Sequence, residues 1–368
     1  MNNRIAMFQP SLRSGGAERV SLNIAGGLAD RGFKVDMVLT EKVGPLLAVV
    51  PSDVRVVDLG ARRVLTSLTG LARYLRRDVP AALITHQWHT SLVALWARWF
   101  AGVDTRIVAK APNTLSMLAQ SPASLRSRMV PRMVRVFAKH MDEIVAVSRG
   151  VAEDLAITAR VSLGDIHVIN NPVVTPDLLN RSREAVDHPW FDESAPPVIL
   201  GAGRLVREKD FATLIRAFAL VRQERPARLL IVGEGVERPI LEALVRDLGL
   251  GIDVQLPGYV ENPNALMSRC AVFVLSSVTE GLAGVLIEAL AAGAPVVATD
   301  CRWSPREILD GGRLGRLVPP REERAMAAAI LATLDQPVER ASVEELERYS
   351  LDFAVERYLR VLGMSENE

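Results

Sequence analysis

The sequence predicts an α/β fold built from two doubly wound domains. Short apolar runs alternate with amphipathic segments of helical length, a pattern typical of parallel sheets covered by helices. The alternation stops at residues 173–196, which are rich in Pro, Asp, Glu and Ser, and then starts again at Val198. A chain of 368 residues is long enough for two domains of ordinary size. We therefore expect a first domain over 1–172, a linker over 173–196 and a second domain over 197–350.

The composition is that of a globular protein, with 49% hydrophobic and 24% charged residues. No apolar run reaches the roughly 20 residues that a membrane-spanning helix needs. Cys270 and Cys301 lack metal-binding spacing, which favours a reducing cytoplasm without disulfides. Because the first strand begins almost directly after Met1, we expect no signal peptide.

The net charge of +1 conceals an asymmetry between the two halves of the chain. Residues 1–180 hold 22 Lys and Arg against 14 Asp and Glu, a net +8, whereas the remainder is at −7. Two segments in the positive half, 62–77 and 124–139, combine an apolar stripe with clustered arginines. Such helices either cover a sheet with their arginines in solvent or contact an anionic membrane surface, and the sequence leaves both open. We expect no nucleic-acid partner.

Apolar runs and turn residues define the elements of the first domain. Strands are expected at 5–8, 34–39, 54–59, 82–85, 106–109, 143–147 and 167–169. Helices are expected from the Gly15-Gly16 pair to Leu28, over both arginine-rich segments, from Ser91, and after Ser148, which can act as an N-cap. The glycine pair would let the backbone approach a bound group, although a tight turn explains it equally well.

Two histidines, His86 and His89, follow the strand at 82–85. Open α/β sheets bind ligands at the carboxyl ends of their strands, so this position suits a functional site. The spacing would also fit metal ligands, but the sequence places no Cys or third His nearby, and we expect no metal.

The second domain repeats the pattern, with strands at 198–203, 228–232, 254–256, 271–275 and 295–298. Helices are expected at 211–221 and 238–248, from Pro263, and at about 283–292. In the turn after the first of these strands, Arg204 supplies a planar fork and Lys209 a point charge, the pair that suits a diphosphate. An ordinary solvated loop is the alternative.

Two glutamates mark the last strand-loop-helix unit. Glu288 has apolar neighbours on every side, so we expect a buried carboxylate, which needs a partner or a ligand. A structural ion pair would satisfy it as well. Glu280 lies in the loop at the carboxyl end of a strand, and the amides of Leu282 to Gly284 lead into a helix N-terminus that suits phosphate.

Glu280 and Glu288, the seven residues between them and the following run 291–300 resemble the signature of the family 4 retaining glycosyltransferases. Residues 304–309 resemble members that build bacterial surface glycans, and 15–19, 203–210 and 233–235 match as well. One departure is Leu282-Ala283, where the family often has an aromatic residue or Pro. This departure leaves the donor sugar open.

The resemblance implies the GT-B architecture, two Rossmann-like domains across a cleft, with a final helix at about 351–368 crossing back to the first. It implies transfer of a hexose, with retention, from a nucleotide diphosphate sugar, expected to be a UDP-sugar, to a glycan or polyprenyl-linked glycan hydroxyl. No cofactor is implied, and the sequence lacks the Asp-x-Asp motif of metal-dependent enzymes. We expect a cytoplasmic protein, with or without peripheral contact at the inner membrane face.

The resemblance also assigns roles to residues. Glu280 would contact the donor sugar, Arg204 and Lys209 the diphosphate, Glu288 the ribose diol and, by a looser match, His86 the reacting sugar. The implied donor-binding residues are Gly16, Gly203, Gly233, Glu234, Leu282, Ala283, Gly284, Val285 and Glu288. The implied acceptor-side residues are Gly15, Arg19 and His89. Two alternatives remain open: a nucleotide-sugar epimerase of the same shape, and a nucleotide-sugar binding protein without activity.

Overall fold

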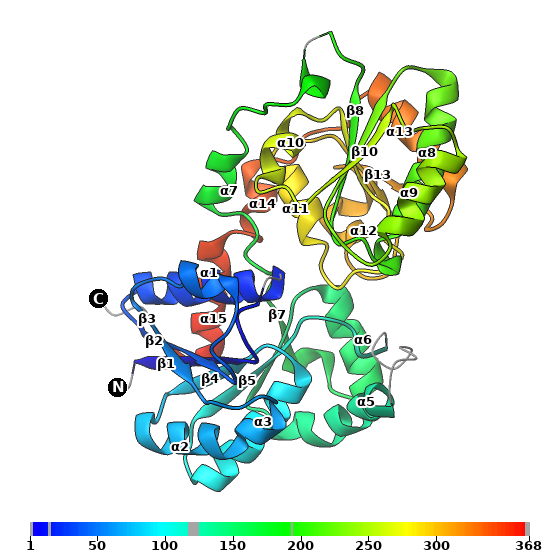
Figure 1. The fold of residues 1–368 in the computed structure, drawn as a ribbon. Helices are drawn as coiled ribbons and strands as arrows, with labels where there is room; N and C mark the ends of the chain where they lie inside the picture. The colour runs from blue at the N-terminus through cyan, green and yellow to red at the C-terminus, as the bar shows by residue number, and fades with distance from the viewer. Residues whose placement is uncertain (1–2, 14–15, 117–124, 193, 365–368) are drawn as a thin grey trace. The chain divides into compact units, whose positions relative to one another are not determined.

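The structure is a computed structural model that describes residues 3–13, 16–116, 125–192 and 194–364. The chain divides into two compact units, which we call the first and the second unit (Figure 1). The first unit holds residues 1–172 together with 348–368, and the second holds residues 173–347.

The first unit is built on a seven-stranded parallel sheet of order β3-β2-β1-β4-β5-β6-β7. Its strands are β1 (Arg4–Gln9), β2 (Lys34–Leu39), β3 (Val54–Asp58), β4 (Ala82–Thr85), β5 (Arg106–Ala111), β6 (Glu143–Ala146) and β7 (Ile166–Val168). The chain builds outward from β1 on one side and from β4 on the other. The strand order therefore reverses between β1 and β4, and the carboxyl ends of these two strands form the switch point where such sheets bind ligands.

Helices cover this sheet as the apolar periodicity predicts. They are α1 (Gly16–Asp30), α2 (Leu68–Asp78), α3 (Trp88–Ala101), α5 (Leu125–Phe137), α6 (Arg149–Ala159) and α15 (Leu351–Leu362). Short 3₁₀ turns are η1 (Pro45–Val49), η2 (Leu65–Ser67), η3 (Ala138–His140) and η4 (Leu163–Asp165). Although α15 comes last in the chain, it packs against α1: a Cβ on Gly27 would lie 2.7 Å from Val355 Cγ2. Tyr358 and Leu359 of α15 are buried in the same core.

Two helix starts differ from the sequence prediction. The segment predicted as helical from residue 62 forms η2 first, and α2 begins only at Leu68. The helix expected from Ser91 begins at Trp88, because Gln87 N–H donates to Thr90 Oγ1 at 3.2 Å and closes a capping box. His89 therefore lies in the first turn of α3 instead of the preceding loop.

The second unit holds a six-stranded parallel sheet of order β10-β9-β8-β11-β12-β13. Its strands are β8 (Val198–Ala202), β9 (Arg228–Val232), β10 (Val254–Gly258), β11 (Val272–Leu275), β12 (Val296–Thr299) and β13 (Arg316–Val318). The helices are α7 (Pro176–Arg181), α8 (Phe211–Glu224), α9 (Arg238–Asp247), α10 (Pro263–Arg269), α11 (Gly284–Ala291), α12 (Pro305–Ile308), α13 (Glu323–Asp335) and α14 (Val343–Glu347). Here the order reverses between β8 and β11, which places the loops after these strands at the switch point.

The stretch expected as a linker, 173–196, counts with the second unit and contains α7 and η5 (Pro189–Phe191). It is tied there by Asn262 Nδ2, which donates to Arg181 O at 2.9 Å. In the described part of the chain, no helix is both long and apolar enough to cross a membrane.

Candidate active site

Lys209 and Glu280 form an ion pair at the carboxyl edge of the second sheet. Lys209 lies in η6 (Arg207–Lys209) after β8, and Glu280 lies in the loop after β11. The distance from Lys209 Nζ to Glu280 Oε1 is 2.6 Å, and the side chains are 21% and 12% exposed. Ser277 Oγ donates to the same carboxylate oxygen at 2.6 Å. An ammonium has three N–H donors and a carboxylate two oxygens, so the pair keeps hydrogen-bonding capacity for a ligand.

Backbone contacts fix the two loops that carry this pair. Ser276 Oγ donates to Lys209 O at 2.7 Å, and Val278 N–H donates to Glu208 O at 2.9 Å. Thr299, at the end of β12, donates from Oγ1 to Ser277 O. The loops after β8, β11 and β12 are thus joined, which positions the Lys209–Glu280 pair before any ligand arrives.

The N-terminus of α11 lies directly after Glu280 in the chain. Its N-cap residue is Ala283, whose side chain cannot accept a hydrogen bond, and Ala283 N–H donates to the buried hydroxyl of Ser304 at 3.0 Å. Ala283 is buried, whereas Leu282, Gly284 and Val285 are partly exposed. A helix start of this kind can bind phosphate through backbone amides.

Glu288 is only half-buried, so the expectation of a buried carboxylate is wrong. The buried face of α11 is formed by Leu286, Ile287, Ala289 and Leu290, and Glu288 lies beside that face. The apolar neighbours in the sequence suggested burial on all sides, but α11 packs on one side only. The position of Glu288 is compatible with a ligand contact but does not require one.

The glycines after β8 and β9 meet each other's backbone. Gly233 has a φ of +134°, and a Cβ there would lie 1.9 Å from Gly203 O. The loops are joined by Leu205 N–H, which donates to Glu234 O at 2.8 Å. Backbone packing is therefore sufficient to explain why glycine occupies position 233.

Two charged side chains of these loops, Arg204 and Glu234, are exposed. Glu234 is 57% exposed and pairs with Arg238 at 2.9 Å. Arg204 is exposed and forms no hydrogen bond or ion pair with a side chain of the described residues. The guanidinium of Arg204 is therefore available to an anionic ligand.

The described first-unit residues named from the sequence are distributed over α1, the end of β4 and α3. Gly15 lies outside the described residues, and Gly16 is the exposed first residue of α1. Arg19 and His89 are exposed, on α1 and α3 respectively. His86, at the carboxyl end of β4, is 5% exposed, and its Nδ1 lies 3.1 Å from Ser21 Oγ.

Burial and the nearby charge of Lys110 hold the pKa of His86 well below its ordinary value. Within the described ranges, no three His, Cys, Asp or Glu side chains come together in a way that could hold a metal ion.

Sequence reasoning missed several polar residues around these sites. Ser277 and Ser304 are small hydroxyl residues near Glu280, and only their neighbours in the folded chain show what they bind. Lys110 is 3% exposed on β5, and burial lowers the pKa of its ammonium to about 7. The one signal that could have found it is a lysine inside an otherwise apolar strand.

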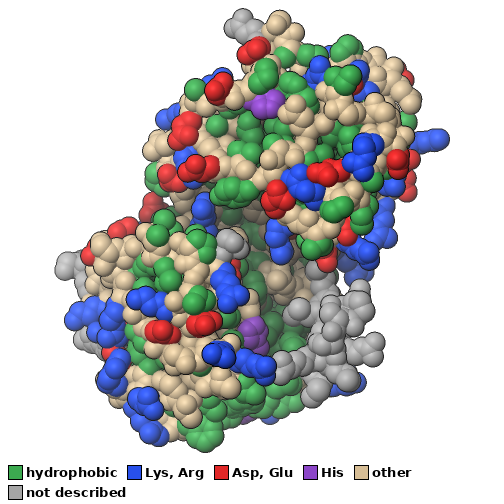
Figure 2. Space-filling model, viewed as in Figure 1, with side chains coloured by type: hydrophobic (Ala, Val, Ile, Leu, Met, Phe, Trp, Pro, Cys, Tyr) green, Lys and Arg blue, Asp and Glu red, His purple; other side chains and the backbone are tan. Residues whose placement is uncertain are grey.

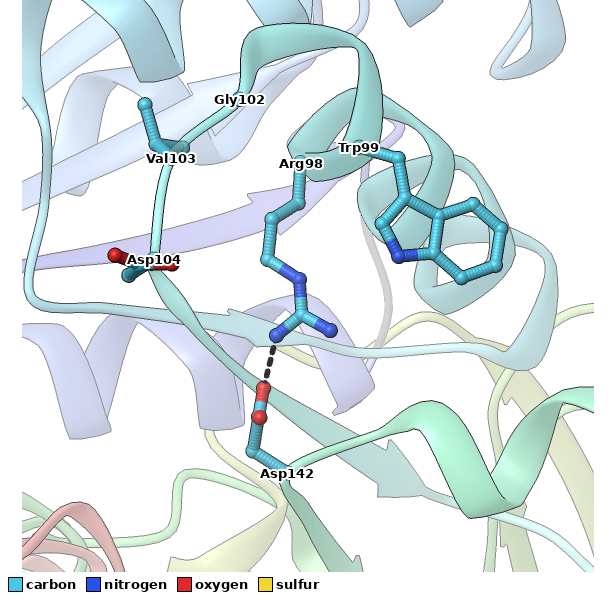
Figure 3. A pocket seen from close by; sticks show the side chains of 6 residues that line it. All are labelled: Arg98, Trp99, Gly102, Val103, Asp104 and Asp142. Carbon is cyan, nitrogen blue, oxygen red and sulfur yellow. Dashed lines mark hydrogen bonds and ion pairs between the residues drawn. The ribbon is translucent and has the colours of Figure 1, made fainter.

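A pocket at the end of α3 is formed by other residues of the first unit. It is lined by Arg98, Trp99, Gly102, Val103, Asp104 and Asp142, and Arg98 forms an ion pair with Asp142 (Figure 3). Asp104 and Asp142 lie just before β5 and β6, so the pocket is at the amino edge of the sheet. None of the site residues named from the sequence lines it.

Comparison with known proteins identifies the family. The description "Glycosyltransferase Family 4" matches residues 14–176, and "Glycosyl transferases group 1" matches residues 196–336. The chain belongs to the family 4 glycosyltransferases. One relative of this glycosyltransferase is the N-acetylgalactosamine-N,N'-diacetylbacillosaminyl-diphospho-undecaprenol 4-alpha-N-acetylgalactosaminyltransferase of Campylobacter jejuni, 29% identical over 90% of both chains. Another is the lipopolysaccharide core biosynthesis glycosyltransferase LpsE of Rhizobium meliloti, 27% identical over 86% of this chain and 85% of LpsE.

Solved structures confirm the predicted GT-B fold of this glycosyltransferase. HepE of Anabaena, crystallised with UDP and glucose, has a TM-score of 0.79 at 19% identity, covering 98% of this chain and 99% of HepE. A glycosyltransferase from Rickettsia africae has a TM-score of 0.79 at 18% identity, covering 98% and 97%.

Proposed function

We propose that this glycosyltransferase transfers a hexose, with retention, from a UDP-sugar to a hydroxyl of a lipid-linked glycan during bacterial surface polysaccharide synthesis. The observation that carries the proposal is the Lys209–Glu280 pair, held at the switch point of the second unit at the start of α11. A cation, a carboxylate and a helix N-terminus together suit a sugar diphosphate, which presents both hydroxyls and negative charge.

The proposed chemistry uses these groups as follows. Negative charge builds up on the diphosphate as it leaves, and Lys209, Arg204 and the α11 amides stabilise that charge. Glu280 accepts a hydrogen bond from a hydroxyl of the donor sugar, and Glu288 accepts from the ribose diol. The departing phosphate takes the proton of the acceptor hydroxyl on the same face of the sugar, which retains the anomeric configuration. The cations supply the charge that a metal supplies in Asp-x-Asp enzymes, so we propose a metal-independent transfer.

The relatives support the finer parts of the proposal. HepE was crystallised with UDP, which favours a uridine nucleotide in this chain. The Campylobacter enzyme is named for an acceptor linked to diphospho-undecaprenol, which favours a polyprenyl-linked acceptor here. The Rhizobium relative is named for lipopolysaccharide core synthesis, which favours a surface glycan.

A polyprenyl-linked acceptor would bring the protein to a membrane surface. The apolar stripe of α2 is buried within the first unit, through Leu71, Tyr74 and Leu75. This helix would therefore reach a membrane through its exposed Arg73, Arg76 and Arg77. Lys and Arg side chains gather on the side of the first unit where α2 and β3 lie in Figure 1 (Figure 2).

Two exposed aromatic side chains lie at the end of α3, the helix that packs against α2. Trp99 and Phe100, at the end of α3, are 51% and 65% exposed. Phe100 lines a shallow groove together with Arg73 and Arg76 of α2. Arginines next to exposed aromatic side chains are the composition of a peripheral membrane contact.

The decisive experiment incubates the protein with a panel of nucleotide sugars, with and without a short polyprenyl diphosphate-linked glycan. We expect UDP release that depends on the acceptor, and a product whose anomeric proton has the configuration of the donor. Inversion of that configuration would refute retention. Interconversion of donor sugars without acceptor would favour the epimerase alternative, and tight donor binding without turnover would favour a binding protein.

A further inference from the structure

Three polar residues lie side by side at the carboxyl ends of the central strands of the first unit. β1 and β4 pair in register up to Phe8 and Thr85, and β4 and β5 up to Thr85 and Ala109. The next residues in this register are Gln9, His86 and Lys110. Residues in register on parallel strands point to the same face of the sheet. His86 is within hydrogen-bond distance of Ser21 of α1, so the face that the three residues share is the one covered by α1.

All three side chains are buried, and each has polar groups without a partner among the described residues. Gln9 and Lys110 are 3% exposed and His86 is 5% exposed. Gln9 Nε2 and His86 Nε2 have no hydrogen-bond partner in the structure as described. No described residue forms a hydrogen bond or ion pair with the Lys110 ammonium. Such groups are costly to bury unless they bind water or a ligand.

The charged groups near Gln9, His86 and Lys110 do not neutralise the Lys110 ammonium. From α6, Asp154 is buried, but its Oδ2 accepts from the backbone amides of Leu115 and Ser116 at 2.6 and 3.2 Å. On α1, Arg19 is exposed, whereas Glu18 is partly exposed and lies one turn before Ser21; no ion pair joins either side chain to Lys110. From β4, His86 is itself kept neutral by burial and by the charge of Lys110. On β6, the residues beside Lys110 are apolar, Val145 and Ala146.

His86 can join the other two as a hydrogen-bond donor. Ser21 Oγ lies 2.9 Å from Ala17 O and 3.1 Å from His86 Nδ1, so the Ser21 hydroxyl can donate its proton to either of these two acceptors. When Ser21 donates to Nδ1, the proton of the neutral ring is on Nε2. In that tautomer Gln9, His86 and Lys110 present N–H donors and a positive charge, with no acid among them. Such a set matches an oxyanion.

We propose that Gln9, His86 and Lys110 form a binding site in the first unit for an oxyanion of a substrate, with Lys110 as its charge partner. This inference deepens the proposed function, on which it rests for the identity of the ligand. A phosphate could come from the nucleotide diphosphate donor or from a polyprenyl diphosphate acceptor. The chemistry is the same in both cases, and calorimetry with a probe of each kind distinguishes the two sources.

The site gives binding a distinctive pH dependence. Burial lowers the pKa of the free Lys110 ammonium to about 7, and a bound oxyanion raises it. Below pH 7 the free site is already charged, so the affinity is nearly constant. Above pH 7 the free site is neutral and binding takes up a proton, so the affinity falls up to about tenfold for each pH unit.

The experiment titrates the full-length protein with UDP and, separately, with farnesyl diphosphate as a short polyprenyl probe. Calorimetry at pH 8 in two buffers of different ionisation enthalpy measures affinity and proton uptake together. The variant is Lys110→Met, which keeps most of the length of the side chain and removes its charge. Lys34→Met is the matched control, because Lys34 is exposed at the amino end of β2 in the same unit.

We expect Lys110→Met to lower the affinity for one of the two probes at least tenfold and to abolish proton uptake for that probe. Lys34→Met should change neither quantity. If Lys110→Met loses affinity for UDP, the site binds the donor. If it loses affinity for farnesyl diphosphate, the site binds the acceptor. Wild-type affinity of Lys110→Met for both probes, or no proton uptake by the wild type with either probe, overturns the inference.

Two further measurements keep this result separate from folding and from the proposed function. Lys110→Arg keeps the charge and should retain much of the affinity if Lys110→Met loses it; equal loss in both variants would count against a charge contact. Sugar transfer is measured independently. If the enzyme transfers sugar but Lys110→Met binds both probes with wild-type affinity, the inference is refuted and the proposed function is not.

Discussion

Replacing Lys209 by alanine tests the centre of the candidate active site. In the structure Lys209 Nζ lies 2.6 Å from Glu280 Oε1, and the carboxylate is 12% exposed. The variant would remove a cation from the proposed diphosphate position and leave Glu280 with Ser277 as its remaining described partner. We therefore expect two effects, one on the reaction and one on the stability of the fold.

The effect on the reaction should be the larger one. A preorganised donor that acts on the charge of the transition state contributes about 2–4 kcal/mol, so kcat should fall roughly 30- to 1000-fold. Breaking the ion pair should cost about 1–2 kcal/mol of unfolding free energy, between the values for exposed pairs and for fully buried pairs. That loss leaves a domain of ordinary stability folded.

Steady-state kinetics at saturating donor and chemical denaturation measure these two quantities. Arg246→Ala is the control, because Arg246 is an exposed arginine in the last turn of α9 in the same unit. It should leave both quantities near wild type. A Lys209→Ala enzyme that is folded and turns over at a near-normal rate would refute the assignment of Lys209 to the leaving diphosphate.

Three other predictions follow from the same geometry. Glu288→Gln should weaken UDP binding measured by calorimetry, because a ribose contact is equally strong in the ground state and the transition state. Glu280→Gln should chiefly lower kcat, and the same effect of both variants on both quantities would contradict these roles. Treatment with EDTA should leave turnover unchanged, and a loss that magnesium or manganese restores would show a metal requirement. Trp99→Ala combined with Phe100→Ala should reduce sedimentation with anionic liposomes at low salt, with neutral liposomes and high salt as controls; absence of binding by the wild type would favour a soluble acceptor.

The order of strands and helices could be read from the sequence because it depends on local patterns. The predicted bounds of β4 and β9 agree with the structure, since each is a short apolar run bounded by turn or polar residues. The start of α3 was missed because the capping box of Gln87 and Thr90 is an uncommon variant of the Ser or Thr motif. Such errors move a boundary by a few residues, but here the shift changed the environment of His89.

Contacts across the fold could not be predicted in the same way. Lys209 and Glu280 were both named from the sequence, yet they are 71 residues apart, and their ion pair depends on β8 and β11 being neighbours. The row of Gln9, His86 and Lys110 depends on the register of three strands, which no local pattern encodes. Glu288 was expected to be buried and is only half-buried, because apolar neighbours along a helix do not reveal on which side the helix packs.

The contact between α1 and α15 has a consequence for how the protein is made. Arg31 and Asp352 form an ion pair across 321 residues of chain, and the buried side chains of α15 belong to the same core as those of α1. During synthesis the first unit is therefore without part of its core until the ribosome has translated the second unit. The second unit is continuous in sequence and has its own core, so it can fold first. A nascent chain stalled before residue 351 would carry an uncovered apolar surface on α1, which makes it a substrate for chaperones and prone to aggregation.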